Sequence, residues 1–141
     1  MSAASATSPR TVALVAAGGA AGAVARYQLG RWFPTTAPDF PTTTLAVNVA
    51  GALLIGVLYA WLPRRRPHDS WRRPLLGIGA LGAFTTFSTL CTETVLLVRA
   101  NATPTAVGYV AVSLAAGLIA VVAGIRIGRG PLRADLASGE S

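Results

Sequence analysis

Charged residues are scarce in this chain. Only 12% of its 141 residues are charged, whereas soluble domains average about 25%. This deficit argues against an ordinary water-soluble surface and favours a membrane protein. The remaining charge is mostly basic: 12 arginines and no lysines stand against five acidic residues, for a net charge of +7. Because the arginines cluster between apolar runs rather than along one element, they do not indicate a nucleic-acid partner.

Cysteine and histidine are almost absent. The single cysteine, Cys91, excludes an intrachain disulfide, and its apolar surroundings indicate a packing role. The single histidine, His68, lies in a basic loop, and no convincing set of catalytic residues accompanies it. We therefore expect no enzyme activity.

Four long apolar runs dominate the sequence. The first covers residues 12–24 and continues, more polar, to residue 33. Residues 45–62 and 106–125 contain no charge, and residues 74–98 contain only Glu93. Because about 20 mainly apolar residues cross a bilayer as a helix, the sequence predicts an all-α integral membrane fold. The expected parts are a disordered leader (1–10), a four-helix domain (11–129, with spans at about 11–33, 42–62, 74–99 and 105–129) and a disordered tail (130–141).

Arginines are distributed unevenly between the two ends of the predicted bundle. The end that holds both termini and the second loop has eight, and the other end has two: Arg10, Arg64, Arg65, Arg66, Arg72, Arg73, Arg129 and Arg133, against Arg31 and Arg99. Since basic loops stay in the cytoplasm, both termini are predicted to be cytoplasmic. The first run also resembles a secretory signal peptide, but Arg26 and Arg31 would then follow an unclear cleavage site.

Residues 85–89, Thr-Thr-Phe-Ser-Thr, place four hydroxyls and one aromatic ring inside the third run. In hydrocarbon a hydroxyl needs a partner or a wet path, so we interpret the segment as part of a lined pathway. If the helix breaks after Gly82, the hydroxyls could hydrogen-bond the freed backbone groups, and the break would expose carbonyl oxygens that can bind a cation. In an unbroken helix, the hydroxyls would instead bond back to the preceding turn. The positive edge of the Phe87 ring could meet a small anion, or the ring could simply pack.

Glycines recur within the apolar runs. Gly18 and Gly22 form a small-xxx-small face typical of closely packed membrane helices. Gly77, Gly79 and Gly82 match the GxGxxG dinucleotide pattern, but the strand that such a site needs is lacking before them. We interpret these three as helix-packing residues.

Five other polar residues within the spans each allow a structural and a functional interpretation. Arg26 either snorkels to the interface or draws anions towards a pore mouth. Asn48 either fixes helix packing or donates its amide N–H to a passing anion. Glu93 either binds protons or pairs with an arginine of a partner chain. Tyr109 and Ser113, one turn apart, form interhelical bonds or place two hydroxyls on a pathway.

A pattern spread over residues 18–129 is similar to that of a known family. It consists of residues 18–22 with Arg26 and Tyr27, residues 41–44 with Val47, Asn48 and Gly51, then Gly77, Gly79 and Gly82 before residues 85–89, and finally Tyr109 with Ser113. In this pattern the chain resembles the CrcB/Fluc family of bacterial fluoride channels.

The resemblance implies a passive fluoride-selective channel that exports cytoplasmic fluoride and lowers its toxicity. It implies an antiparallel, dual-topology dimer in the lipid bilayer of the bacterial inner (plasma) membrane, with the third helix broken near its centre. A structural, non-transported sodium ion would bind the backbone carbonyls of Gly82 and Thr85. Arg26 would lie in the vestibule, and the implied pore-lining residues are Asn48, Phe87, Ser88, Thr89, Leu90, Tyr109 and Ser113.

One departure from the family pattern bears on the dimer. Leu90 stands where the family usually has a second pore phenylalanine, and an aliphatic group lacks the positive ring edge. The arginine bias should also fix one orientation, so we hypothesise a heterodimer with an oppositely inserted homologue rather than a homodimer. Two other functions stay open: a pore-inactive or half-active partner subunit, and a small multidrug-type proton-coupled transporter that uses Glu93.

Overall fold

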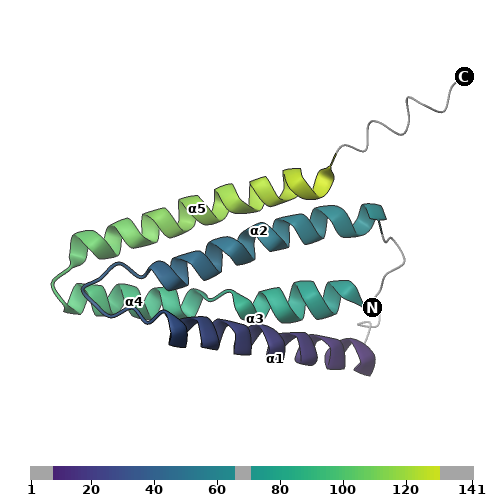
Figure 1. The fold of residues 1–141 in the computed structure, drawn as a ribbon, viewed down its shortest axis with the longest axis horizontal. Coiled ribbons are helices and arrows are strands. Elements are labelled where there is room, and N and C mark those ends of the chain that lie inside the picture. Colours follow the sequence, from purple (N-terminus) through teal and green to yellow (C-terminus); the bar gives the residue numbers. More distant parts are fainter. Residues whose placement is uncertain (1–7, 66–70, 131–141) are drawn as a thin grey trace, which may run out of the picture.

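A computed structural model describes residues 8–65 and 71–130, and within these ranges every regular element is helical (Figure 1). The elements are α1 (Pro9–Trp32), α2 (Thr42–Arg65), the π-helix η1 (Arg73–Leu81), α3 (Gly82–Phe84), α4 (Phe87–Arg99) and α5 (Thr103–Arg129). Four stretches are long and apolar enough to cross a bilayer: α1, α2 up to Pro63, the series from η1 to α4, and α5. The predicted all-α fold with four candidate membrane spans is confirmed.

Local capping explains where the first helix begins. The Ser8 side chain accepts a hydrogen bond from the Thr11 amide at 3.3 Å, and Pro9 occupies the first turn, where its missing N–H costs nothing. The helix therefore begins at Pro9 rather than at about residue 11. The rest of the predicted leader, residues 1–7, and residues 131–141 of the predicted tail lie outside the described residues.

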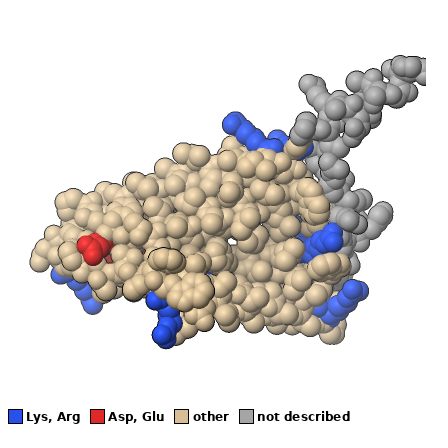
Figure 2. All heavy atoms as spheres, viewed as in Figure 1, with Lys and Arg blue, Asp and Glu red and all other residues tan. Residues whose placement is uncertain are grey.

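Each membrane-spanning segment runs antiparallel to the next one along the chain, so the helix ends that carry most of the arginines lie at one end of the bundle. The start of α1, the end of α2, the start of η1 and the end of α5 lie together (Figure 1). We call this the arginine-rich end. The acidic residues that the structure describes are Asp39 and Glu93, and they lie towards the opposite end, where Figure 2 shows red atoms.

Glycines bring two pairs of helices into backbone contact. A Cβ on Gly18 or Gly22 of α1 would collide with the backbone of η1, at Leu75 and Ala80 respectively. A Cβ on Gly124 of α5 would collide with the Leu53 carbonyl of α2. The close-packing role predicted for Gly18 and Gly22 is confirmed, because only a residue without a side chain permits this approach.

The third span changes conformation in its middle. α3 ends at Phe84, and Thr85 (φ −75°, ψ 154°) and Thr86 (φ −146°, ψ 121°) have extended backbones. α4 then begins at Phe87 and packs on α5 through a small apolar core: Leu90, Leu97, Ala106 and Tyr109. These two extended threonines position the site described next.

Candidate functional site

Asn48 of α2 holds the extended backbone of Thr86 at both polar groups. Its Nδ2 donates to the Thr86 carbonyl at 2.9 Å, and its Oδ1 accepts from the Thr86 amide at 2.8 Å. In a continuous helix that amide would donate to the Gly82 carbonyl. The structure therefore favours the packing interpretation of Asn48, although an amide nitrogen carries a second N–H that these bonds do not use.

The Thr86 hydroxyl connects the side chains at the start of α4. Its Oγ1 accepts from the Thr89 amide at 3.1 Å, donates to the Thr89 hydroxyl at 2.9 Å, and lies 3.2 Å from Ser88 Oγ. In a continuous helix the Thr89 amide would instead donate to the Thr85 carbonyl. Thr86 thus caps α4 and gathers three hydroxyls around the helix N-terminus, where the backbone dipole is positive.

Arg26 of α1 reaches the same interruption from the other side. Its Nε donates to the Ala83 carbonyl at 3.1 Å. The last carbonyls of a helix lack intrahelical donors, so a guanidinium there satisfies one of them. Side chains of two other spans, Asn48 and Arg26, therefore hold the interrupted segment in place.

Glu93, one turn beyond Thr89 on α4, has two hydroxyl partners. Thr44 of α2 donates to Oε1 at 2.7 Å, and Tyr109 of α5 donates to Oε2 at 2.6 Å. The Tyr109 side chain is fully buried and meets the Phe40 ring edge-on, with 5.4 Å between centroids. The carboxylate thereby links three spans, and this partly buried pairing is an alternative to the partner-chain arginine considered from the sequence.

A cavity of about 380 Å³ joins these groups. Arg26, Thr44, Thr86, Thr89 and Glu93 all contribute to its wall. The cavity wall therefore contains threonine hydroxyls, the two arginines Arg26 and Arg31, and the Glu93 carboxylate.

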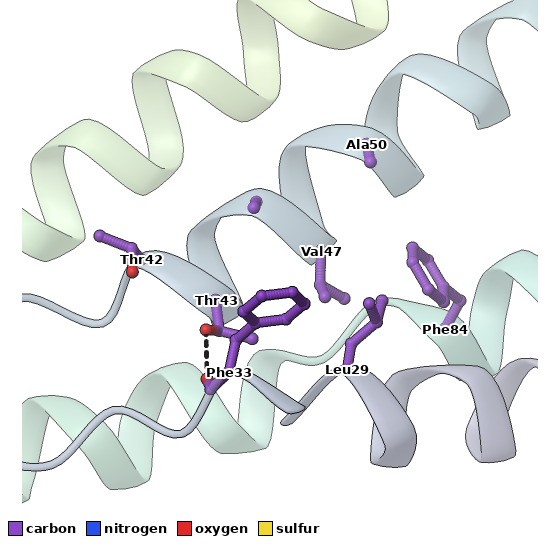
Figure 3. A pocket seen from close by; sticks show the side chains of 8 residues that line it. Leu29, Phe33, Thr42, Thr43, Val47, Ala50 and Phe84 are labelled. Atoms are coloured by element: carbon purple, nitrogen blue, oxygen red, sulfur yellow. Dashed lines mark hydrogen bonds between the residues drawn. The ribbon is translucent and has the colours of Figure 1, made fainter. Parts of the chain in front are cut away.

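An apolar pocket of about 430 Å³ adjoins this cavity between α1 and α2 (Figure 3). Leu29, Val47 and Phe84 lie around it, and the Phe33 ring projects over it. The Thr43 hydroxyl donates to the Phe33 carbonyl and ties the end of α1 to the start of α2. Phe33, Thr43 and Val47 belong to both walls, so apolar surface flanks the polar cavity.

The amino-acid sequence of the chain is similar to those of a known protein family. Residues 13–125 match the family described as CrcB-like protein, Camphor Resistance (CrcB). The chain belongs to the CrcB family. A relative from Symbiobacterium thermophilum, named fluoride-specific ion channel FluC 2, is 48% identical over 80% of this chain and 93% of its own length. Proteins named fluoride-specific ion channel FluC from Novosphingobium aromaticivorans and Agrobacterium fabrum are 46% and 43% identical, each over 84% of this chain and 95% of their own length.

The predicted pore residues of this CrcB-family chain fall into separate environments. Asn48 and Thr89 meet at Thr86, beside Ser88, whereas Phe87 is 73% exposed on the surface of the subunit. The structure does not bring Leu90 to that surface: it is 8% exposed and packs against Tyr109 in the α4–α5 core.

Ser113, one turn beyond Tyr109 on α5, has a different environment again. The residue is 8% exposed, and its buried Oγ has no hydrogen-bond partner among the described residues. It lies one helical turn from the Tyr109–Glu93 pair, on the same face of α5.

Sequence reasoning missed Thr44 as a site residue. Its hydroxyl donates to Glu93, while Asn48, four residues later, holds Thr86. The spacing is itself a signal, because residues i and i+4 share one face of a helix. Two polar side chains at this spacing in an apolar span indicate a face directed at polar partners.

Among the described residues no cluster of three His, Cys, Asp or Glu side chains is placed to hold a metal. A metal at this site would therefore depend on other oxygens. The carbonyls of Gly82 and Thr85 both lose their usual helical donors, since the Thr86 and Thr89 amides donate to side chains instead. Carbonyl oxygens of this kind suit a hard cation.

Proposed function

We propose that this chain forms a passive, fluoride-selective channel that lets cytoplasmic fluoride leave down its gradient and so lowers its toxicity. One observation carries the proposal: the exposed Phe87 ring stands at the N-terminus of α4 beside the connected hydroxyls of Thr86, Ser88 and Thr89. The names of the curated relatives support it.

The Thr86 hydroxyl donates its proton to Thr89, whereas the Ser88 and Thr89 hydroxyls, the helix N-terminus and the Phe87 ring edge can present positive charge density to a small anion. Hydroxyl protons replace part of a fluoride ion's hydration shell, the positive end of the α4 dipole favours an anion, and the edge of an aromatic ring carries the positive part of its quadrupole. Arg26 in the cavity wall raises the local anion concentration. Nothing in this arrangement requires bond making or breaking.

The proposed assembly is an antiparallel dimer whose two subunits enclose the path. Phe87 supports it, because a ring that is 73% exposed on its own subunit needs a second subunit to form a closed wall. The interrupted third span, which leaves Phe87 at the first turn of a new helix, would then lie at the dimer interface.

We further propose that the partner is an oppositely inserted homologue. The arginine-rich end favours one orientation, with both termini in the cytoplasm of a bacterium. Leu90 supports unequal pores, because it packs inside its own subunit and supplies no ring edge. A homodimer in which the same chain inserts both ways is the competing arrangement.

The Gly82 and Thr85 carbonyls are the proposed ligands of a structural sodium ion. Asn48 and Thr86 support this role, because their side chains take the two amide donors that these carbonyls would otherwise accept. When bound, the ion would balance several oxygen dipoles at the interruption and would not itself be transported.

Fluoride release from liposomes tests the function. Vesicles loaded with fluoride and containing the purified chain, alone or together with an oppositely inserted homologue, should release fluoride much faster than empty vesicles. Chloride-loaded vesicles serve as the selectivity control. If vesicles with either composition held fluoride as well as empty ones, the channel proposal would fail.

A pore-inactive partner subunit is the second candidate, and the buried Leu90 side chain favours it. The same assay separates the two. Release that requires the homologue, and that survives Phe87→Ala in this chain, would assign the conducting path to the homologue.

A further inference from the structure

The outward face of α5 carries an apolar groove that ends at a cation. Leu118, Ile119, Val122 and Ala123 line a groove of about 280 Å³, and Arg126 lines it as well. Leu118 and Ile119 are 66% and 69% exposed. The opposite face of the helix packs against α2 and α4, so this groove is separate from the proposed pore residues (Figure 1).

The dimensions of the groove fit one leaflet of a bilayer. From Leu118 to Arg126 the helix rises about 12 Å, at about 1.5 Å per residue. The hydrocarbon of one leaflet is about 15 Å deep, half of a typical bilayer core. Arg126 lies one turn before the end of α5 at Arg129, so its stem can follow the apolar wall while its guanidinium reaches headgroup level.

Charge at this end of the molecule selects the kind of headgroup. The described residues contribute five arginines whose side chains lie near the arginine-rich end: Arg10, Arg72, Arg73, Arg126 and Arg129. The two acidic residues in the described part of the chain, Asp39 in the connection between α1 and α2 and Glu93 in α4, belong to the elements at the other end, where Figure 2 shows red atoms. A lipid with a net negative headgroup is therefore favoured there over a zwitterionic one.

We propose that the α5 groove binds an acyl chain of an anionic phospholipid whose phosphate contacts Arg126. The apolar wall recognises the chain, and the guanidinium recognises the phosphate. One arginine near a charged lipid surface contributes about fivefold in affinity. This surface would stabilise the subunit in the leaflet that is richer in anionic lipid.

Native mass spectrometry of the full chain tests this proposal. The protein is reconstituted with equal amounts of phosphatidylglycerol and phosphatidylcholine, extracted, and analysed for retained lipid. Wild type should retain phosphatidylglycerol preferentially, and Arg126→Gln should lower that preference about fivefold. Arg126→Lys, which keeps the charge, should preserve most of it.

Two further variants separate headgroup from chain. Arg99→Gln removes an exposed arginine at the opposite end of the bundle and should leave the preference unchanged. Ile119→Ala should lower the retention of both lipids alike, because it shortens the apolar wall without altering charge. Gln and Arg have similar helix propensities, so the α5 variants should remain folded.

Several outcomes would overturn the proposal. One is an unchanged lipid preference in Arg126→Gln, and another is an equal loss in Arg99→Gln, which would indicate general surface charge. Displacement of phosphatidylglycerol by inorganic phosphate would assign Arg126 to a free anion. A shift in the monomer–dimer ratio of Arg126→Gln, with lipid retention unchanged, would mean that a partner subunit covers the groove.

Discussion

Replacing Asn48 with alanine should release the interrupted third span from α2. The substitution removes both hydrogen bonds to Thr86, at 2.9 and 2.8 Å, and leaves a backbone N–H and C=O without these partners. A typical intramolecular hydrogen bond contributes about 1 kcal/mol net, and an unsatisfied buried group costs about 1–3 kcal/mol. We therefore expect Asn48→Ala to lower the unfolding free energy by about 2–4 kcal/mol. The ratio of folded to unfolded protein would then fall at least about 30-fold.

Reversible unfolding in mixed micelles, followed by the fluorescence of the three tryptophans, measures this loss. Gln28→Ala, which removes an exposed amide on α1, is the matched control and should change stability by less than about 0.5 kcal/mol. Asn48→Asp keeps the acceptor for the Thr86 amide but places an oxygen against the Thr86 carbonyl. When ionised it should be no more stable than Asn48→Ala.

The same variants also separate two roles of Asn48. If it positions the interruption, then stability and fluoride release fall together. A variant with wild-type stability and abolished release would show that the amide acts on the anion directly, and the reasoning from the Thr86 contacts would be refuted. A variant unchanged in both measurements would refute both roles.

Three other substitutions test separate parts of the structure. Phe87→Ala should slow fluoride release at least about tenfold, which corresponds to a rise of roughly 1.4 kcal/mol in the barrier to permeation. Its stability should change little, because the ring is 73% exposed. A stable, fully conducting variant would contradict the pore role of Phe87. Glu93→Gln should leave fluoride release largely intact. It should lower the unfolding free energy by about 1 kcal/mol, because the amide nitrogen cannot accept the hydrogen bond that Tyr109 or Thr44 donates. Abolished transport would instead favour the proton-coupled alternative. Gly22→Ala should lower the unfolding free energy by about 1–3 kcal/mol, because the added methyl would strike the η1 backbone. The control Gly117→Ala has open space around it and should be neutral or stabilising. Equal effects of the two substitutions in unfolding assays would refute the contact.

Hydrophobicity and glycine spacing were sufficient to predict the scaffold. The four candidate spans follow from apolar runs that meet or approach the length needed to cross a bilayer, and the contact of Gly18 and Gly22 with another helix follows from their spacing. The helix boundaries moved by a few residues where caps decided them, as at Ser8. These properties depend on local composition, which a sequence displays directly.

The partners of the polar residues could not be predicted in the same way. Asn48 could have faced an anion or a backbone, and Glu93 a proton, an arginine or a hydroxyl, because each side chain satisfies all of these chemically. The choice depended on elements far apart in the chain: Asn48 lies 38 residues from Thr86, and Arg26 lies 57 residues from Ala83. Packing of α1 and α2 around the third span made that choice.

The sequence alone therefore determined that this chain is helical, spans a membrane and carries a hydroxyl-rich segment in its third span, since these follow from the free energy of transfer of each side chain. Only the tertiary structure decided that Asn48 and Arg26 hold that segment, that Thr44 and Tyr109 pair with Glu93, and that Phe87 is exposed while Leu90 is buried. Those outcomes depend on which helix faces approach each other. That approach is a property of the whole packed bundle.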